Sequence, residues 1–186
     1  MRILFAITAL MLSLSASGQE YGKKFVDIYV NINGQDPKSF VMEDDTLKIT
    51  SGWFEPKNFI LEISNKSSGI LYVDFNKSYF ILGGETSDVV PGETYIKDLN
   101  LEVKKTKVAP EARASVNLYS RERNNEFNPI FSSRQAHKAY KTDKSFLTEK
   151  LVLAFEDENG SKFKREFIFE VRAAKLVNDL KKQARK

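Results

Sequence analysis

The chain has 186 residues and a formal net charge of +4, from 29 Lys and Arg against 25 Asp and Glu. It has no cysteine and a single histidine, which excludes disulfide staples and a Cys–His nucleophile pair and argues against a zinc site. The charge excess is mild, both signs are interspersed and no nucleic-acid-binding motif occurs, so we expect no nucleic-acid partner.

Residues 1–18 have the pattern of a secretory signal peptide. Arg2 supplies a positive start, an apolar run extends from Ile3 to Leu14, and small residues come just before Gln19. This order predicts cleavage before Gln19 and export to the periplasm or to the outside of the cell. The apolar run is too short for a helix that must cross about 30 Å of hydrocarbon, so we expect no transmembrane anchor. The remaining residues, 19–186, suit one domain.

Hydrophobic residues alternate with polar ones along most of the chain. Val26, Ile28, Val30 and Ile32 occupy every second position, which places them on one face of a strand. The same pattern predicts further strands, at Thr46–Thr50, Asn58–Ser64, Leu71–Phe75, Ser78–Leu82, Thr94–Val103 and Arg113–Tyr119. Frequent turns without strand–helix alternation predict an all-β fold. We expect an antiparallel β-sandwich of about nine strands, with the immunoglobulin-like type as the default.

Two turns predict hairpins. The polar segment Asn65–Gly69 has turn composition and separates two predicted strands. A clearer hairpin lies near the C-terminus, where Asn159 and Gly160 both tolerate positive φ. It should pair residues 151–155 with residues 163–171 and bury four side chains, those of Leu153, Phe155, Phe167 and Phe169.

Two segments depart from the alternation. The polar segment 120–148 is much longer than an ordinary loop, so it is either an ordered excursion with a short helix around Arg134–Tyr140 or a mobile loop. Residues 172–185 have apolar side chains at helical spacing among Lys and Arg, which predicts a basic amphipathic helix. Because its apolar stripe is narrow and lacks aromatic anchors, we expect this helix to dock on its own domain rather than on a membrane.

The sequence offers little for catalysis. A Ser-His-Asp triad would require His137, which we expect to be a solvent-facing loop residue of the polar segment. The acidic clusters Glu43–Asp45 and Glu156–Asn159 lack the spacing of a calcium-binding loop. We therefore expect no metal and no cofactor. A carboxylate-based hydrolase ranks third among the functions, because acidic residues are plentiful but nothing places two of them across a cleft.

Aromatic and basic residues supply the candidate binding sites. Within 120–148, we expect Phe131 and Tyr140 to be exposed beside Arg134 and Lys138, facing a partner with an acidic rim and an apolar centre. Packing of these aromatic rings onto the domain is the alternative. We expect Trp53 on a loop, where it could stack on a sugar, or else in the core.

These features favour a non-enzymatic binding or accessory protein of the bacterial cell envelope, which acts by contacting another envelope protein. A short leader and a lysine-rich, cysteine-free mature chain are the grounds for a bacterial envelope. In a sandwich with one long loop, binding residues tend to lie on the loop. The alternative function is a carbohydrate-binding module with an aromatic platform near Trp53.

Overall fold

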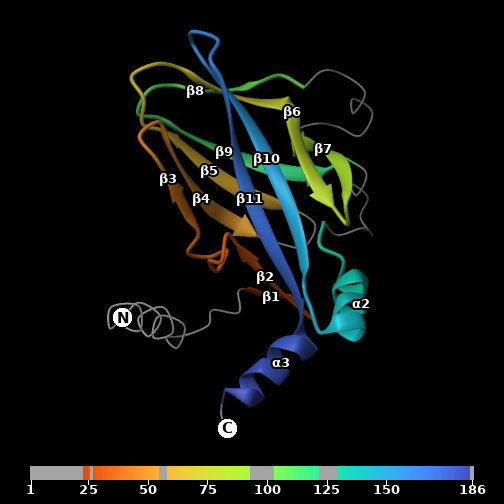
Figure 1. Cartoon of the computed structure of the whole chain (residues 1–186). Helices are drawn as coiled ribbons and strands as arrows, with labels where there is room; N and C mark the ends of the chain where they lie inside the picture. The colour runs from red at the N-terminus through yellow and green to blue at the C-terminus, as the bar shows by residue number, and fades with distance from the viewer. Residues whose placement is uncertain (1–22, 26, 55–57, 93–102, 122–129, 185–186) are drawn as a thin grey trace, which may run out of the picture.

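The computed structural model describes residues 23–25, 27–54, 58–92, 103–121 and 130–184. In this part of the chain an antiparallel β-sheet curls on itself, and two helices, α2 and α3, lie together at one end of it (Figure 1). The strands hydrogen-bond along one path, in the order β1-β2-β11-β10-β6-β7-β9-β5-β4-β3, with β8 beside β6. The predicted strand-rich, antiparallel class is therefore confirmed.

The path has two halves, which we name after their central strands. The β10 half contains β1 (Lys23–Phe25), β2 (Ile28–Ile32), β6 (Leu71–Leu82), β8 (Thr106–Val108), β10 (Leu147–Asp157) and β11 (Lys162–Ala173). The β5 half contains β3 (Val41–Glu43), β4 (Leu47–Phe54), β5 (Phe59–Asn65) and β9 (Arg113–Ser120). Strand β7 (Glu85–Pro91) joins the halves, because its first residues pair with β6 and its last residues pair with β9.

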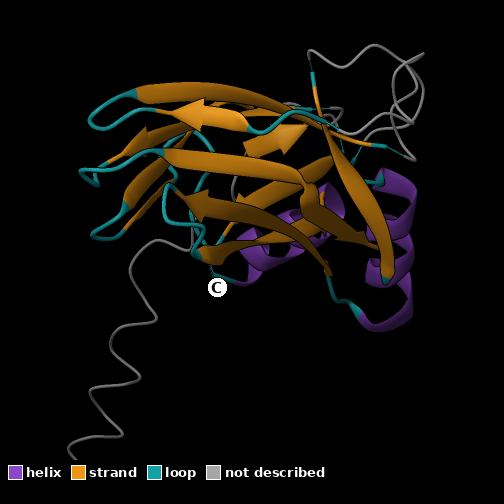
Figure 2. Ribbon diagram, turned by 90° about the horizontal axis from the view of Figure 1, so that it is seen from above, coloured by secondary structure: helices purple, strands orange, loops and turns teal. Residues whose placement is uncertain are grey.

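The two halves enclose one apolar core, and Figure 2 shows the strands curling around this shared interior. The ring of Phe59 in β5 lies 6.1 Å from that of Phe80 in β6 and 5.4 Å from that of Phe169 in β11, measured between centroids. Phe40, just before β3, lies 5.8 Å from Phe167 of β11. These rings are essentially inaccessible to solvent, so aromatic packing holds the halves together.

The predicted C-terminal hairpin is confirmed. Strands β10 and β11 pair from Leu147↔Val171 to Glu156↔Lys162, and Gly160 takes a φ of +81° in the turn between them. The four side chains expected in the core are buried, with exposures of 0–1%: Leu153, Phe155, Phe167 and Phe169. The alternation therefore identified the inward face of this hairpin.

The predicted hairpin at Asn65–Gly69 is wrong. Strand β5 pairs with β4 and β9, whereas β6 pairs with β10, β7 and β8, so the turn carries the chain from one half to the other. The buried Asn65 fixes this crossover, since its Nδ2 donates to the carbonyls of Gly69 and Val108. Turn composition predicts that the chain reverses direction, but not which strands then pair.

Strand β6 combines two segments that the alternation separates. It runs unbroken from Leu71 to Leu82, and an irregularity in its pairing with β10 lies between the two predicted strands. It then turns tightly into β7 through Gly83 and Gly84, whose φ angles of +64° and +85° suit a two-residue hairpin. Strands β1, β3, β7 and β8 carry too little alternation to be found from the sequence.

The C-terminal helix is confirmed and is shorter than predicted. Helix α3 spans Ala174–Gln183, because the preceding Arg172 and Ala173 still pair with β2 as part of β11. Leu176 and Val177 are buried, and Leu180 packs against the cluster formed by Tyr140, Ala173 and Leu176. The helix therefore docks on its own domain, as its narrow apolar stripe predicts.

Some predictions concern residues outside the described part of the chain. The signal peptide, 1–18, lies there completely. The predicted strand Thr94–Val103 lies there except for its last residue, and so do residues 122–129 of the polar segment.

Candidate binding surface on helix α2

The polar segment contains helix α2, Ser133–Asp143, at the position predicted for a short helix. The Ser132 side chain caps its start by accepting from the backbone N–H of Gln135 at 3.3 Å. Lys144 ends the helix in the left-handed region, at φ +60°, and its N–H donates to the carbonyl of Tyr140. Both ends of the helix are thus satisfied locally, and α2 is an ordered element of the domain.

Asp27, in the turn between β1 and β2, ties both helices to the sheet. Its Oδ2 accepts from the Ser133 hydroxyl at 2.5 Å and lies 3.2 Å from Nε2 of His137. Its backbone carbonyl accepts from the N–H of Ala174, the first residue of α3, at 2.7 Å. Ser133 and His137 reach the same carboxylate because residues four apart share one face of a helix.

These contacts hold the pKa of Asp27 below its ordinary value of 3.8. The hydrogen bond from Ser133 is the largest cause, and the His137 contact acts in the same direction. Partial burial opposes them by favouring the neutral acid. Asp27 is therefore an ionised anchor at neutral pH.

His137 is not the loop residue that the sequence suggested, because it lies on α2 and contacts Asp27. The contact does not form a catalytic relay. In such a relay the histidine lies between the acid and the nucleophile. Here the carboxylate of Asp27 lies between Ser133 and His137, so its contacts hold the helix in place.

The prediction that Phe131 and Tyr140 are exposed is wrong, since their side chains are 1% and 5% accessible. Phe131 packs 5.0 Å from Phe169 in the core. Tyr140 donates its hydroxyl to Asp179 of α3 at 2.5 Å, and this hydrogen bond, with burial, raises the pKa of Tyr140. Burial of the two rings removes apolar surface from water and stabilises the folded chain. The rings therefore anchor α2 and are not exposed to a partner.

The outward face of α2 is positively charged. Arg134, Lys138 and Lys141 are exposed and follow one another at helical spacing; we call these three residues the α2 basic face. They border a surface hollow of about 650 Å³, which is lined by Ser132, Arg134, Gln135, His137, Lys138, Lys141 and Thr142. No carboxylate lines this hollow, and the three cations make no ion pair with any described residue.

The structure therefore divides the predicted site residues. Arg134 and Lys138 stand together on the α2 basic face, while Phe131 and Tyr140 lie beneath the helix. Trp53 belongs to β4 rather than to a loop, and its side chain lies outside the described residues. Sequence reasoning missed Lys141 as part of the face and Asp27 as its support. The spacing of Ser133 and His137 could indicate that they share a hydrogen-bond partner, but it could not identify that partner as Asp27.

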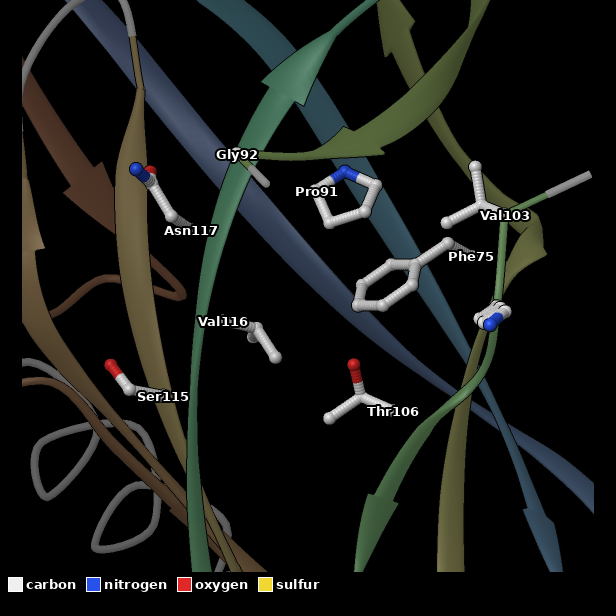
Figure 3. A pocket seen from close by; sticks show the side chains of 9 residues that line it. Phe75, Pro91, Gly92, Val103, Thr106, Ser115, Val116 and Asn117 are labelled. Carbon is white, nitrogen blue, oxygen red and sulfur yellow. The ribbon is translucent and has the colours of Figure 1, made fainter. Parts of the chain in front are cut away.

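Another hollow, of about 360 Å³, opens where β7 ends beside β8 and β9 (Figure 3). The buried Phe75 and Val116 lie at its apolar side, and Thr106 and Asn117 contribute polar groups. A Cβ at position 92 would lie 2.8 Å from Nδ2 of Asn117 and 2.9 Å from the ring of Tyr119, so a larger residue than glycine would displace these side chains. Lys104 is the sole charged residue among the described side chains that line it, so this hollow is chemically unlike the one on α2.

Neither described helix has the length and apolar character that a membrane-crossing helix needs. Within the described ranges, no three side chains of His, Asp or Glu come close enough together to hold a metal ion.

No protein-family model matches the chain, and no curated protein matches it. Among solved structures, the chain is similar to the one described as "X-ray structure of Northeast Structural Genomics Consortium target SoR45". The two are 11% identical, the match covers 79% of this chain and 86% of that chain, and the TM-score is 0.32. This likeness is too distant to carry an argument about fold or function.

Proposed function

We propose that this protein is an exported, non-enzymatic accessory protein of the bacterial cell envelope, built on a sandwich-type scaffold, which holds an acidic partner protein on the α2 basic face. The observation that carries the proposal is the group formed by Arg134, Lys138 and Lys141. Three exposed cations border one hollow and have no anionic partner among the described residues. Such a group attracts an acidic surface and raises the rate of association.

Rigid support of α2 also favours a binding role. Asp27 and Asp179 hold its two sides through Ser133 and Tyr140, while Phe131 anchors the segment that precedes it. A surface held in place loses little conformational entropy when a partner binds, which favours affinity. The sequence predicted binding residues on a loop of the scaffold, whereas our proposal assigns binding to a helix of that scaffold.

Charge reversal on α2 tests the proposal. The mature protein, its Lys138→Glu/Lys141→Glu variant and a Lys38→Glu/Lys107→Glu control are used to capture proteins from an envelope extract. The control changes the net charge equally at exposed lysines outside the hollow. We expect one acidic protein to be retained by the wild type and the control, to be lost from the α2 variant, and to elute as salt rises.

Three results would contradict this function. Equal capture by the α2 variant would show that the interface lies elsewhere on the protein. Loss of capture by both variants would show that net charge alone drives the binding. Binding of the mature protein to vesicles of phosphatidylglycerol, without any captured protein, would assign the α2 basic face to a membrane surface instead.

A further inference from the structure

The curled sheet ends at strand β3, whose outer edge lies beside no other strand of the described residues (Figure 1). On its inner side β3 pairs with β4. Successive residues of an antiparallel strand direct their N–H and C=O groups alternately to the two sides. The N–H of Asp44, just after β3, donates to the carbonyl of Leu47 at 3.0 Å and so points toward β4. The backbone groups of Val41 and Glu43 therefore point outward.

The side chain of Gln35 occupies the outward groups of Val41. Its Oε1 accepts from the N–H of Val41 at 3.1 Å, and its Nε2 donates to the carbonyl of Val41 at 3.2 Å. A carboxamide has one acceptor group and one donor group, as a peptide unit has. Gln35 therefore makes the same two hydrogen bonds that a neighbouring strand would make at this position.

A tight turn that is fastened to β11 holds Gln35 at this edge. The backbones of Ile32 and Gln35 exchange two hydrogen bonds of 2.9 Å, which close the turn. Within it, Asn33 donates its N–H to the carbonyl of Ile168, and its Oδ1 accepts from the N–H of Ile168, both at 2.7 Å. The turn thus connects the edge of β11 with the edge of β3, and the position of Gln35 is fixed from both sides.

The side chains of β3 would not prevent pairing if Gln35 were absent. Val41 is apolar and 41% exposed, whereas strand edges that avoid pairing commonly present a charge, most often a lysine. The acid of this edge, Glu43, is already paired, since Nζ of Lys48 and Nζ of Lys66 lie 3.7 Å and 2.9 Å from its carboxylate. Gln35 is therefore the group that closes this edge.

We propose that the outer edge of β3 is a latent pairing surface for a second copy of this chain, which the Gln35 side chain keeps closed. In an antiparallel pair of β3 strands about a two-fold axis, Val41 lies opposite Glu43 of the second copy, and Glu43 lies opposite its Val41. All outward backbone groups then find partners, and no two like charges face each other, so the edge is complementary to itself. None of these residues lines the hollow on α2, so the proposal is independent of the α2 basic face.

Sedimentation velocity of the mature protein tests this proposal. We expect the wild type to remain monomeric and Gln35→Ala to shift toward a dimer as its concentration rises through about 0.01–1 mM, the range of a weak dimer. Lys38→Ala shortens an exposed side chain of the same connection and should remain monomeric. Gln35→Ala/Val41→Lys should also be monomeric, because a lysine on the edge opposes strand pairing.

Hydrogen exchange followed by NMR tests the Gln35 contact in the wild type itself. The amide of Val41 donates to Gln35, whereas the outward amide of Glu43 has no acceptor among the described residues. We therefore expect the amide of Val41 to exchange at least about tenfold more slowly than that of Glu43. In dilute Gln35→Ala this difference should disappear, and both amides should gain protection as the dimer forms.

The proposal is overturned if Gln35→Ala stays monomeric at every concentration, or if the wild type dimerises as strongly as the variant. Association that persists in Gln35→Ala/Val41→Lys would place the interface away from β3 and has the same consequence. If Gln35→Ala fails to fold, Gln35→Met replaces it, because methionine keeps the length of the side chain and lacks both amide groups. Equal exchange of the Val41 and Glu43 amides in the wild type overturns the proposal without any variant.

Discussion

Ser78 shows how one side chain can replace part of a strand ladder. Its hydroxyl lies at the β6 bulge, where it accepts from one buried backbone group and donates to another. The N–H of Ala154 would otherwise face the bulge without an acceptor, and a buried N–H of this kind lowers stability. The bulge is therefore a built part of the sheet, although the alternation of residues shows only an interruption.

Ser78→Ala should lower the free energy of unfolding by about 1–3 kcal/mol, because it leaves buried backbone groups unsatisfied. Urea denaturation followed by tryptophan fluorescence measures the change. Ser68→Ala is the control, since Ser68 is exposed in a turn and should stay within about 0.5 kcal/mol of the wild type. Equal stability of the two variants would mean that water satisfies the bulge as well as the serine does.

Asp27 makes the attachment of α2 dependent on pH. The folded protein holds the pKa of Asp27 below 3.8, chiefly through Ser133, so the ionised acid favours the folded state. This stabilisation is complete when the pH is well above 3.8, the ordinary pKa of the carboxyl group. It is lost as the pH falls through the lower pKa of the folded state.

The stability lost in Asp27→Asn should therefore be largest at neutral pH and should shrink between about pH 5 and pH 2. Urea midpoints of both proteins, measured across this range, test the sign. Asp45→Asn removes the same charge from an exposed position and should show no comparable trend. A loss in Asp27→Asn that stays constant with pH would place the effect in packing rather than in the ionised hydrogen bonds.

At the scale of elements, the β10–β11 hairpin is the part of the fold that the sequence predicts best. Its inner face supplies the rings that meet Phe40, Phe59 and Phe131 from the surrounding segments. Phe167→Ala should thus lower the free energy of unfolding by about 3–5 kcal/mol through lost burial and a cavity. The neighbouring Ile168, 38% exposed, points the other way, and Ile168→Ala should cost far less in the same urea titration. The reverse order would place the wrong face inward.

The sequence predicts elements better than it predicts their partners. Alternation located β11, β5 and β9, because one face of each strand is buried and the other is more exposed. It also located β4 and β10, although Val152 and Ala154 on the second face of β10 are buried too. It could not show that β5 and β6 belong to different halves, since pairing depends on contacts far apart in the chain. It also split β6 at Asn76 and Lys77, where the bulge interrupts the period.

The candidate site was predicted only in part, for a related reason. Arg134 and Lys138 are exposed as charged residues of a polar segment usually are. Phe131 and Tyr140 could not be placed, because their burial depends on β11 and α3, which lie later in the chain. The burial of Asp74 could not be predicted, because an acid in a strand normally faces water and only the bulge and its neighbours bury this one.

At the scale of the whole molecule, the β10–β11 hairpin runs from the end of the sheet that carries α2 and α3 to the opposite end (Figure 1). Its open end leads from α2 into β10 and from β11 into α3, and Ala154 and Lys164 lie nearer its turn. The α2 basic face therefore lies at the open end of the hairpin whose inner face forms much of the core.

The shared core also predicts that the two halves of the sheet unfold together. Phe59 of β5 contacts Phe80 and Phe169, which belong to the other half, and β7 pairs with strands of both. Phe59→Ala removes these inter-half contacts and should lower the free energy of unfolding by about 3–5 kcal/mol. Because neither half keeps a core without the other, we expect a single cooperative transition to persist in the variant.

Hydrogen exchange measured by mass spectrometry tests this coupling. Amides in the centres of β5 and β10 should lose equal protection in Phe59→Ala, since both exchange through the same global opening. Ile60→Ala serves as the control, because Ile60 is the neighbouring, partly exposed residue of β5 and its loss should reduce protection much less. If β5 alone lost protection while β10 kept the wild-type value, the halves would be separate cooperative units. The ring contacts across the core would then stabilise each half without coupling them.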